Sequence, residues 1–338
     1  MATRSTKTQK FRIKPFWWPV LLILSPLILL ILLIKWIKFV RGTRRVEKAN
    51  RQRIDRAVGI DLPEVERLEL TVIVDQYAKE GFLGDSGVSY LLRTERGTTL
   101  FDVGFGPMTS TFEVNTRKLN ISSDDVEEII ISHLHTDHMG GNTAQRKKMV
   151  TVPESFLGGE TKKCYVPDKA GSNQFDTQRV NKPTIMKSGV TSIGPLARML
   201  FFFGYTEEQA LVVNLKGKGV AVLTGCGHPT IEVILEMVKK MTNKPIYAII
   251  GGMHFPITRS RSNVLGFDLQ RIVGTGKPAW RSVNDGDLTQ TIDSISRAKP
   301  KALLLSGHDT CDYSLERMRD EINVERCEIL KAGEVYTL

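Results

Sequence analysis

Six consecutive residues near the middle of the chain carry four side chains that commonly bind metal ions. His133 and His135 are two positions apart, so their imidazoles point the same way on an extended segment, and Asp137 and His138 follow at once. The apolar run 129–131 precedes them and predicts a buried strand. Because ligand sites in α/β proteins lie beyond the carboxyl ends of strands, we predict a metal site here.

The other histidines also follow apolar runs that predict strands. The chain has 6 histidines, and each lies either in the cluster or just past an expected strand end. Asp102 has a similar position after the run 99–101. We therefore expect these remote side chains to meet the cluster at one edge of the fold. The three histidines are His228 after 221–224, His254 after 249–250 and His308 after 303–305.

The remaining pattern predicts a layered α/β domain over residues 68–338. Apolar residues at helical spacing predict helices over 229–241 and 287–298. Paired strands followed by strands that alternate with helices are typical of a layered α/β fold. The expected strands cover 70–74, 89–93, 98–102, 127–132, 210–215, 219–224, 247–250 and 302–305.

The motif His-x-His-x-Asp-His after a strand resembles the signature of the metallo-β-lactamase superfamily. This resemblance implies a four-layer αββα sandwich with two adjacent divalent metal ions. In that arrangement His133 and His135 bind the first metal, and Asp137 and His138 bind the second. The last histidine of the superfamily pattern, which is His308 here, completes the second site.

The segments 101–104, 207–211, 224–229 and 251–255 occur in this order along the chain. They carry a closer resemblance, over residues 68–338, to the branch of 7,8-dihydropterin-6-methyl-4-(β-D-ribofuranosyl)aminobenzene 5′-phosphate synthases. In the wider superfamily pattern, Asp102 matches an early strand-end aspartate that typically supports the metal loop rather than binding metal. Gly227 and Thr230 stand where the branch pattern has Ser and Gly, and the stretch 256–285 is long.

Two positions depart from the superfamily pattern. No histidine lies between His138 and His228, where the third ligand of the first site is usually found, so we infer that His228 takes that place. Cys226 stands where many members have a bridging aspartate. It either bridges the two metals as a thiolate or lines the site, and a thiolate ligand would favour zinc.

These residues predict a metal-dependent hydrolase. Two divalent ions, zinc before others, lower the pKa of a bound water towards about 7. The resulting hydroxide would attack a phosphoester, thioester or lactone, with Asp137 orienting it and His254 binding an oxyanion or donating a proton. Two alternatives stay open: a transferase similar to the dihydropterin synthase branch, and a metal-binding sensor or scaffold, which an incomplete ligand set would mark.

Basic side chains in the stretch 256–285 allow two interpretations. They either contact a phosphate group of the substrate or coat a solvated loop. These residues are Arg259, Arg261, Arg271, Lys277 and Arg281.

The first 67 residues differ in character from the rest. Residues 1–56 hold 14 Lys or Arg and two acids, whereas the remainder holds 33 basic and 35 acidic residues. This distribution argues against a nucleic-acid partner, which needs basic residues on the folded domain, and is typical of a segment beside a membrane. We expect a basic tail (1–15), a transmembrane anchor (16–40) and a basic juxtamembrane connector (41–67) before the catalytic domain (68–338).

The uncharged run 16–34 is the reason for expecting the anchor. One helix over this run would rise about 28 Å, near the hydrocarbon thickness of a bilayer, and tryptophans lie at both ends. Pro26 predicts a kink. A cleaved signal peptide is the competing interpretation, but no small-residue cleavage site follows. Nine basic residues after the run and five before it predict a single-pass protein with a cytoplasmic catalytic domain, a lipid bilayer as partner and a small-molecule substrate.

Overall fold

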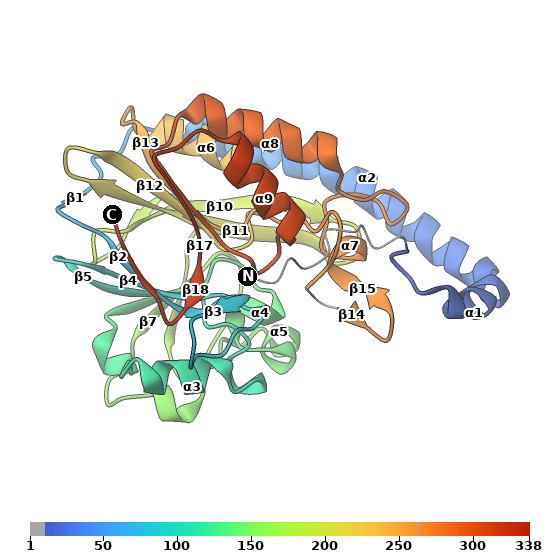
Figure 1. Ribbon diagram of the computed structural model, residues 1–338, viewed down its shortest axis with the longest axis horizontal. Coiled ribbons are helices and arrows are strands. Elements are labelled where there is room, and N and C mark those ends of the chain that lie inside the picture. The colour runs from blue at the N-terminus through green and yellow to red at the C-terminus, as the bar shows by residue number, and fades with distance from the viewer. Residues whose placement is uncertain (1–10, 262) are drawn as a thin grey trace.

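The computed structural model describes residues 11–261 and 263–338, and two β-sheets form its centre (Figure 1). The expected basic tail, 1–15, therefore lies largely outside the described residues. The first sheet pairs antiparallel from β19 to β5 and parallel from β5 to β8. In spatial order its seven strands are β19 (Val335–Thr337), β2 (Glu69–Val74), β4 (Ser89–Thr94), β5 (Gly97–Phe101), β6 (Glu128–Ile130), β7 (Lys163–Val166) and β8 (Asp176–Arg179).

The second sheet has the same order along the chain, with antiparallel strand pairs followed by parallel ones. Its strands pair antiparallel from β9 to β12 and parallel from β12 to β17, and β1 (Glu64–Val65) adds to β11. In spatial order the others are β17 (Arg326–Ile329), β16 (Ala302–Leu305), β13 (Ile246–Gly251), β12 (Gly219–Thr224), β11 (Gly204–Leu215), β10 (Thr191–Leu200) and β9 (Thr184–Ile185).

Two small strand pairs and the helices complete the chain. The pairs are β3 (Tyr77–Ala78) with β18 (Lys331–Ala332), and β14 (Asn263–Val264) with β15 (Phe267–Asp268). The α-helices are α1 (Trp18–Ile23), α2 (Ser25–Arg56), α3 (Thr111–Lys118), α4 (Thr136–Met139), α5 (Asn142–Lys147), α6 (Ile231–Met241), α7 (Leu269–Ile272), α8 (Asp285–Ala298) and α9 (Asp312–Glu321). The 3-10 turns are η1 (Pro15–Trp17), η2 (Gly106–Met108), η3 (Ser123–Asp125) and η4 (Glu154–Phe156).

The helices and sheets form four layers, and a hydrophobic cluster lies between each pair of neighbouring layers. The facing sides of the two sheets meet in a core that includes Leu70, Leu92, Val213 and Leu223. A second cluster joins the other side of the second sheet to α2, α6, α8 and α9, and a third joins the other side of the first sheet to α3 and α5. Figure 1 shows the helices α6, α8 and α9 above the sheets and α3 below them. The mixed α/β fold that the sequence predicts is confirmed, in the order helix, sheet, sheet, helix.

The two predicted helices form where apolar spacing and capping agree. α6 buries Ile231, Ile234 and Val238 on one face. α8 begins after Asn284, whose side chain accepts hydrogen bonds from the first amides of the helix, as an N-cap should. Both helices begin within two residues of the predicted bounds. They cover the second sheet on the side away from the first sheet.

The N-terminal apolar segment is divided between two helices. α1 ends at Ile23, and α2 begins at Ser25 with Pro26 in its first turn. Proline has no amide hydrogen and clashes with the carbonyl four residues earlier, so one straight helix cannot run through this point. No single helix among the described residues is long and apolar enough to cross a membrane, although Pro15–Ile23 and Ser25–Arg56 pass that test together, as a pair bent by 88°. A single transmembrane helix over 16–40 is therefore not confirmed.

The second half of α2 packs on the domain and is not a free connector. Val46, Asn50 and Ile54 are buried, and the Asn50 side chain exchanges two hydrogen bonds with the backbone of Ala197 on β10, at 2.8 and 2.9 Å. The boundary expected between residues 40 and 41 falls inside one continuous helix. The domain that carries the site thus includes part of α2.

Candidate metal centre

The predicted site residues meet at the carboxyl ends of strands from both sheets. Asp102 follows β5, and the segment 133–138 follows β6 and begins α4. Cys226 and His228 follow β12, His254 follows β13, and His308 follows β16. β5 runs parallel to β6, and β12, β13 and β16 run parallel to one another. Because the strands of each set point the same way, their carboxyl ends meet at one edge. All six histidines lie in this cluster.

One group of three imidazoles corresponds to the first predicted metal site. His133, His135 and His228 have ligand atoms that lie within 4.8 Å of one another. His135 Nδ1 is 3.1 Å from His228 Nε2. His133 Nε2 is buried and has no hydrogen-bond partner among the described residues. A buried nitrogen without a partner is costly, and a metal ion would satisfy it.

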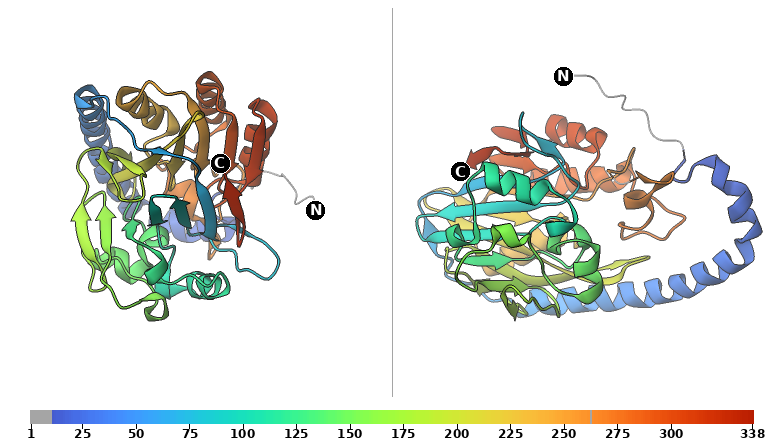
Figure 2. Two further views of the ribbon diagram at one scale, coloured as in Figure 1. Left: turned by 90° about the vertical axis from the view of Figure 1, so that its left-hand side faces the viewer. Right: turned by 90° about the horizontal axis from the view of Figure 1, so that it is seen from below.

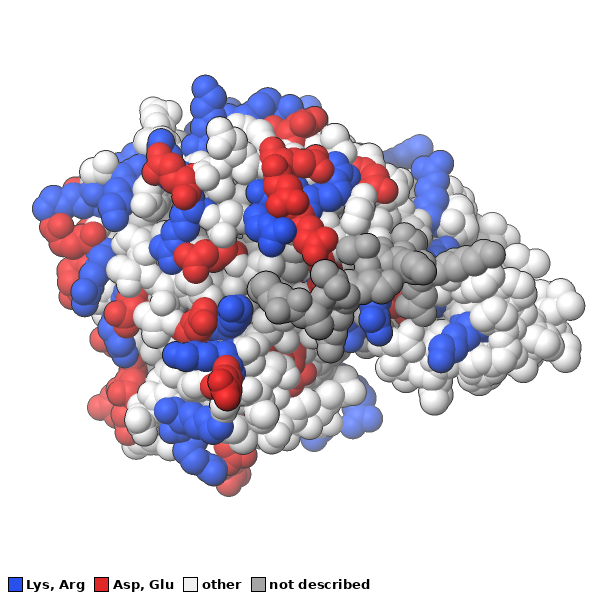
Figure 3. All heavy atoms as spheres, in the orientation of Figure 1, with Lys and Arg blue, Asp and Glu red and all other residues white. Residues whose placement is uncertain are grey.

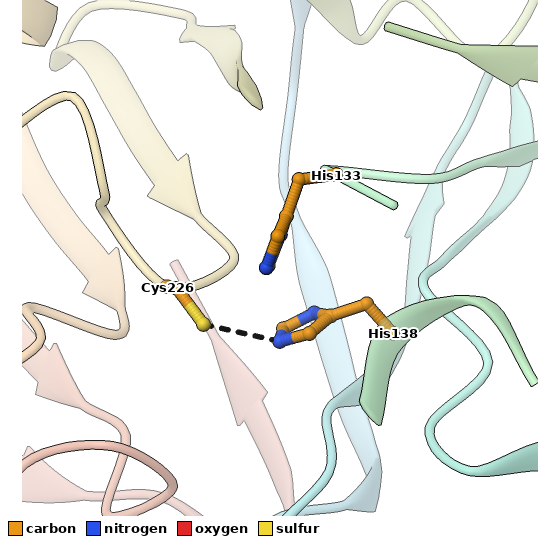
Figure 4. A group of neighbouring side chains, drawn as sticks. All are labelled: His133, His138 and Cys226. Atoms are coloured by element: carbon orange, nitrogen blue, oxygen red, sulfur yellow. Dashed lines mark hydrogen bonds between the residues drawn. The ribbon is translucent and has the colours of Figure 1, made fainter. Parts of the chain in front are cut away.

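A second group corresponds to the second predicted site and includes the cysteine. His138 Nε2 lies 3.1 Å from Cys226 Sγ and 3.2 Å from His308 Nε2, and Cys226 Sγ lies 3.1 Å from the same His308 nitrogen. Figure 4 shows Cys226 on one side of the cluster, pointing toward His133 and His138, which both belong to the segment 133–138. Asp137 Oδ2 is 3.6 Å from His308 Nε2. Asp137 and Cys226 are therefore both within reach of one ion.

Hydrogen bonds on the other ring nitrogens leave these Nε2 atoms with free lone pairs. His138 Nδ1 donates to Asp102 Oδ2 at 2.6 Å, and His308 Nδ1 donates to the Ser86 carbonyl at 2.6 Å. The Ser132 hydroxyl donates to Asp102, so it accepts from His133 Nδ1 at 2.9 Å. A partner on Nδ1 fixes the tautomer that presents Nε2 as a ligand, and this support is typical of metal-binding histidines.

The donor set fits divalent metal ions. Two lone pairs at 3.2 Å repel unless a cation lies between them, and ligands about 2.1 Å from a tetrahedral zinc are separated by about 3.4 Å. Burial and the neighbouring imidazoles lower the pKa of His133, His138 and His228 well below the ordinary value, and burial lowers the pKa of His135 to about 3. The rings are thus neutral, as metal ligands must be.

Asp102 is placed as a supporting residue. Besides His138 it accepts hydrogen bonds from the Ser132 amide and hydroxyl, at 2.6 and 2.7 Å, and it is fully buried. It adopts the left-handed conformation, with φ 61°, which is rare for a non-glycine residue. These contacts hold the start of the segment 133–138 against the end of β5, which is what the expected support of the metal loop requires.

Three buried carboxyl groups at this edge were not predicted from the sequence. Asp309 Oδ2 lies 3.3 Å from His254 Nδ1, and although burial opposes its ionisation, His254 and His308 lower its pKa. Glu208 accepts from the amides of Gly227 and His228, both at 2.8 Å, and burial raises its pKa to about 7. Asp75 likewise accepts from the Gly307 amide. Glu208 and Asp75 hold the two loops that carry Cys226, His228 and His308.

Three of the basic residues in 256–285 have partners within the protein. Arg261 binds Asp312 and the Gly307 carbonyl, Arg271 binds Asp268, and Lys277 binds Asp287. Among the described residues, none of the five predicted basic side chains lines the cavity that includes Asp137, His135 and His308. Lys277 lines an adjoining cavity of about 340 Å³ that shares His228 and His254, so it is the one of the five that lies near the metal ligands. Arg259 and Arg281 are exposed.

The comparisons with known proteins agree with this geometry. The protein family described as "Metallo-beta-lactamase superfamily" matches residues 83–150, which contain the motif 133–138. The fold is similar to that of Tm1679, a solved metal-dependent hydrolase of the beta-lactamase superfamily, with a TM-score of 0.56 and 19% identity over 80% of this chain and 98% of that one. The chain therefore has the metallo-β-lactamase fold, and the resemblance to this superfamily is confirmed.

More particular likenesses are at low identity. The chain is 24% identical over 269 residues to the 7,8-dihydropterin-6-methyl-4-(beta-D-ribofuranosyl)-aminobenzene-5′-phosphate synthase of Methanocaldococcus jannaschii, covering 64% of this chain and 85% of that protein. It is 15% identical to the metallo-beta-lactamase fold protein YhfI of Bacillus subtilis, with a TM-score of 0.47 over 80% of this chain and 99% of that one. The first of these is the synthase branch that the sequence resembles.

Proposed function

We propose that the chain is a metal-dependent hydrolase that binds two divalent metal ions, and that zinc is the preferred metal. The observation that carries this proposal is the meeting of His138 Nε2, His308 Nε2 and Cys226 Sγ at 3.1–3.2 Å in a buried cluster. His133, His135 and His228 would hold the first ion. Asp137, His138 and His308 would hold the second, with Cys226 as its neighbour or as a ligand of either ion.

The chemistry is divided between the ions and the chain. When bound, the ions activate water and polarise the substrate. Asp137 accepts a proton from the attacking water and orients it. His254 donates a proton to the leaving group or binds the developing oxyanion, while Asp309 accepts from His254 Nδ1 and fixes the ring. Phosphoesters, thioesters and lactones are the proposed substrate classes because each offers an electrophilic centre to activated water.

Metal content and hydrolysis test this proposal together. The full chain should be used in detergent, because α2 buries Val46, Asn50 and Ile54 against the domain. We expect two equivalents of zinc by mass spectrometry of the metals, and hydrolysis of at least one member of a panel of phosphoesters, thioesters and lactones. Fewer than one equivalent, or activity that survives His135→Ala, would contradict it.

The role of Cys226 has its own test, with a second cysteine as control. Cobalt bound by a thiolate gives a sulfur-to-metal absorption band, which Cys226→Ala should remove if the thiol is a ligand. Cys164, which is also buried but lies in β7, is the matched control, and Cys164→Ala should leave the band unchanged. If Cys226→Ala leaves the cobalt spectrum unchanged, Cys226 only lines the site.

A transferase related to the dihydropterin synthase is the second candidate. The similarity to the named synthase over 85% of its length favours it. Mass spectrometry would detect the product in that protein's name after incubation with a pterin and a ribosyl aminobenzene phosphate. Formation of that product without hydrolysis of the panel would favour the transferase.

We also propose that residues 16–40 attach the protein to a lipid bilayer, with the catalytic domain in the cytoplasm. The exposed leucines and isoleucines of α1 and the start of α2 support this proposal, and Figure 3 shows that end of the molecule as a protrusion with few charged side chains. Flotation of the full chain with phosphatidylcholine vesicles tests attachment. A C-terminal reporter that fluoresces only in the cytoplasm tests the orientation of the catalytic domain.

A further inference from the structure

The apolar N-terminal segment begins on a hairpin of the catalytic domain. We call residues 18–34, which are α1 and the start of α2, the arch. Before it, the Lys14 amide donates to the Gly266 carbonyl at 3.0 Å, and Trp17 Nε1 donates to the Leu265 carbonyl at 2.8 Å. Ile13 also bridges to Phe267. One end of the arch is thus fixed to the β14–β15 hairpin.

The other end of the arch is fixed to the turn between β10 and β11. Lys35 Nζ donates to the Phe202 carbonyl at 3.0 Å. The Phe39 ring lies 5.5 Å from that of Phe201. Figure 2, on the right, shows α2 and α1 curving around one end of the molecule with the β14–β15 hairpin inside the curve. The arch therefore connects two loops of the catalytic domain.

Both of these loops border the metal cavity, which has a volume of about 360 Å³. Phe203, from the β10–β11 turn, and Val264, from the hairpin, line it and are 52% and 50% exposed. Met108 lines it from the side of the first sheet. The Phe203 ring lies 5.1 Å from the ring of His135. We call Met108, Phe203 and Val264 the mouth of the cavity, and it lies between the two ends of the arch.

The lining of the cavity suits a substrate with an apolar part. Phe105, Leu269 and Val273 continue the apolar wall from the mouth. Among the described residues, the charged side chains of the lining are Asp137 and Asp309, both at the metal centre, and no Lys or Arg lines it. Arg198 and Lys277 line the adjoining cavity that shares His228 and His254, so basic side chains are available there but not along this wall. A hydrocarbon chain would bury apolar surface against it.

We propose that the metal centre acts on a single-chain amphiphile that enters from the lipid layer through this mouth. Its polar head group lies at the metal ligands, and its hydrocarbon chain lies between Phe203 and the hairpin residue Val264. The inference rests on the proposed hydrolytic function and names its substrate class. The arch brings the lipid surface to the mouth, so the substrate need not cross water to reach the cavity.

Photolabelling of the full chain tests this entry route. Zinc-loaded protein in phosphatidylcholine nanodiscs is irradiated with decyl phosphate that carries a diazirine at the end of its chain, and labelled peptides are mapped by mass spectrometry. Ethyl phosphate, which has the same head group without the chain, serves as the competitor. We expect label in 105–108, 200–204 and 263–267 that falls at least fivefold with excess ethyl phosphate. Label in the arch comes from probe dissolved in lipid and should not change.

A matched pair of valines sharpens the result. Val264→Arg should reduce the competitor-sensitive label at least fivefold, whereas Val335→Arg, at a 53% exposed valine on β19, should not. Label at the mouth that ignores the competitor, or that is unchanged in Val264→Arg, would overturn the entry route. Phosphate release is measured in the same samples. Its absence, with inactivity on the whole panel, contradicts the hydrolase proposal, whereas the label pattern alone decides the route.

Discussion

The metal-site edge and the arch depart from ordinary protein surfaces and interiors in opposite ways. At the metal-site edge, His133, His138 and Asp102 are polar and completely buried. In the arch, Leu22 and Leu29 are large, apolar and exposed. Buried polar groups and exposed apolar patches are the informative exceptions to the burial rule. Each is costly unless a component from outside the chain compensates, and the components that we propose are a cation in the first region and a lipid layer in the second.

Removing a ligand at the metal-site edge should have the largest effect. His138→Ala removes a nitrogen that lies 3.1 Å from Cys226 Sγ and 3.2 Å from His308 Nε2, and we expect hydrolysis to fall by more than about 1000-fold, beyond the loss for an outer partner. Asp102→Asn, which keeps the shape of a supporting side chain, should weaken metal affinity by about 10–100-fold. Zinc titration and initial rates measure both. Equal effects of the two substitutions would contradict their different roles.

A charged side chain in the arch should weaken the binding of the protein to lipid vesicles. Leu30 is exposed in the first part of α2, and Leu30→Asp places a carboxylate in the segment that we propose to contact lipid. The transfer scales differ by about 3 kcal/mol between these residues at a membrane centre, so we expect roughly 100-fold less binding to vesicles. Val335→Asp, on β19, is the matched control and should not change flotation. Hydrolysis of a short water-soluble substrate should survive Leu30→Asp.

The buried charge of Asp75 should appear in the pH dependence of stability. Burial raises its pKa to about 6, above about 3.9 in an unfolded chain, so the folded state binds the proton more tightly. The contribution of this proton to the free energy of unfolding is fully present below about pH 4. It is lost as the pH rises through about 6, and the loss is about 3 kcal/mol by pH 7. Asp75→Asn should remove this loss. Urea unfolding at pH 4 and pH 7 measures the difference between the profiles, with exposed Asp293→Asn as control.

The smallest expected effect tests where the arch ends and the domain begins. Asn50→Ala removes two hydrogen bonds to Ala197 on β10, and we expect a loss of about 1–3 kcal/mol in the free energy of unfolding. Vesicle binding should be unchanged, because Asn50 faces the domain. Gln52→Ala, at an exposed amide two residues away, should stay within about 0.5 kcal/mol of the wild type. Loss of vesicle binding in Asn50→Ala would mean that the two halves of α2 are not independent.

The two regions also differ in how far the sequence predicts them. The segment 133–138 could be found because four metal-binding types are adjacent, and the strands before His228, His254 and His308 are apolar enough to locate their ends. Asp309, Glu208 and Asp75 could not be found in this way. The chain has 37 acidic residues, and no local pattern distinguishes Asp75 from those on the surface, whereas Glu208 lies in the segment 207–211 that carries the resemblance. Asp309 offered one signal, its position directly after His308.

Elsewhere the sequence signal was weak for physical reasons. β10 contains Gly194 and Pro195, which read as breakers, and the ladder with β11 shifts register between Ser192 and Pro195. α9 is largely polar and buries only Ser314, Leu315 and Met318. At the arch, Pro26 predicts the kink, but the sequence does not predict its 88° angle. The attachment to the hairpin uses carbonyl groups such as that of Leu265, and backbone contacts leave no pattern of side chains.

The continuity of α2 has a kinetic consequence. It is one helix of 32 residues, about 48 Å long, with its first part in the arch and its second part packed on the second sheet. If the arch lies in a bilayer, as we propose, the domain cannot tumble freely relative to the lipid, and its encounters with an amphiphile would occur in two dimensions. The rate should then depend on the mole fraction of substrate in the bilayer and not on its concentration in the bulk. Dilution with inert lipid at constant bulk concentration should slow the reaction.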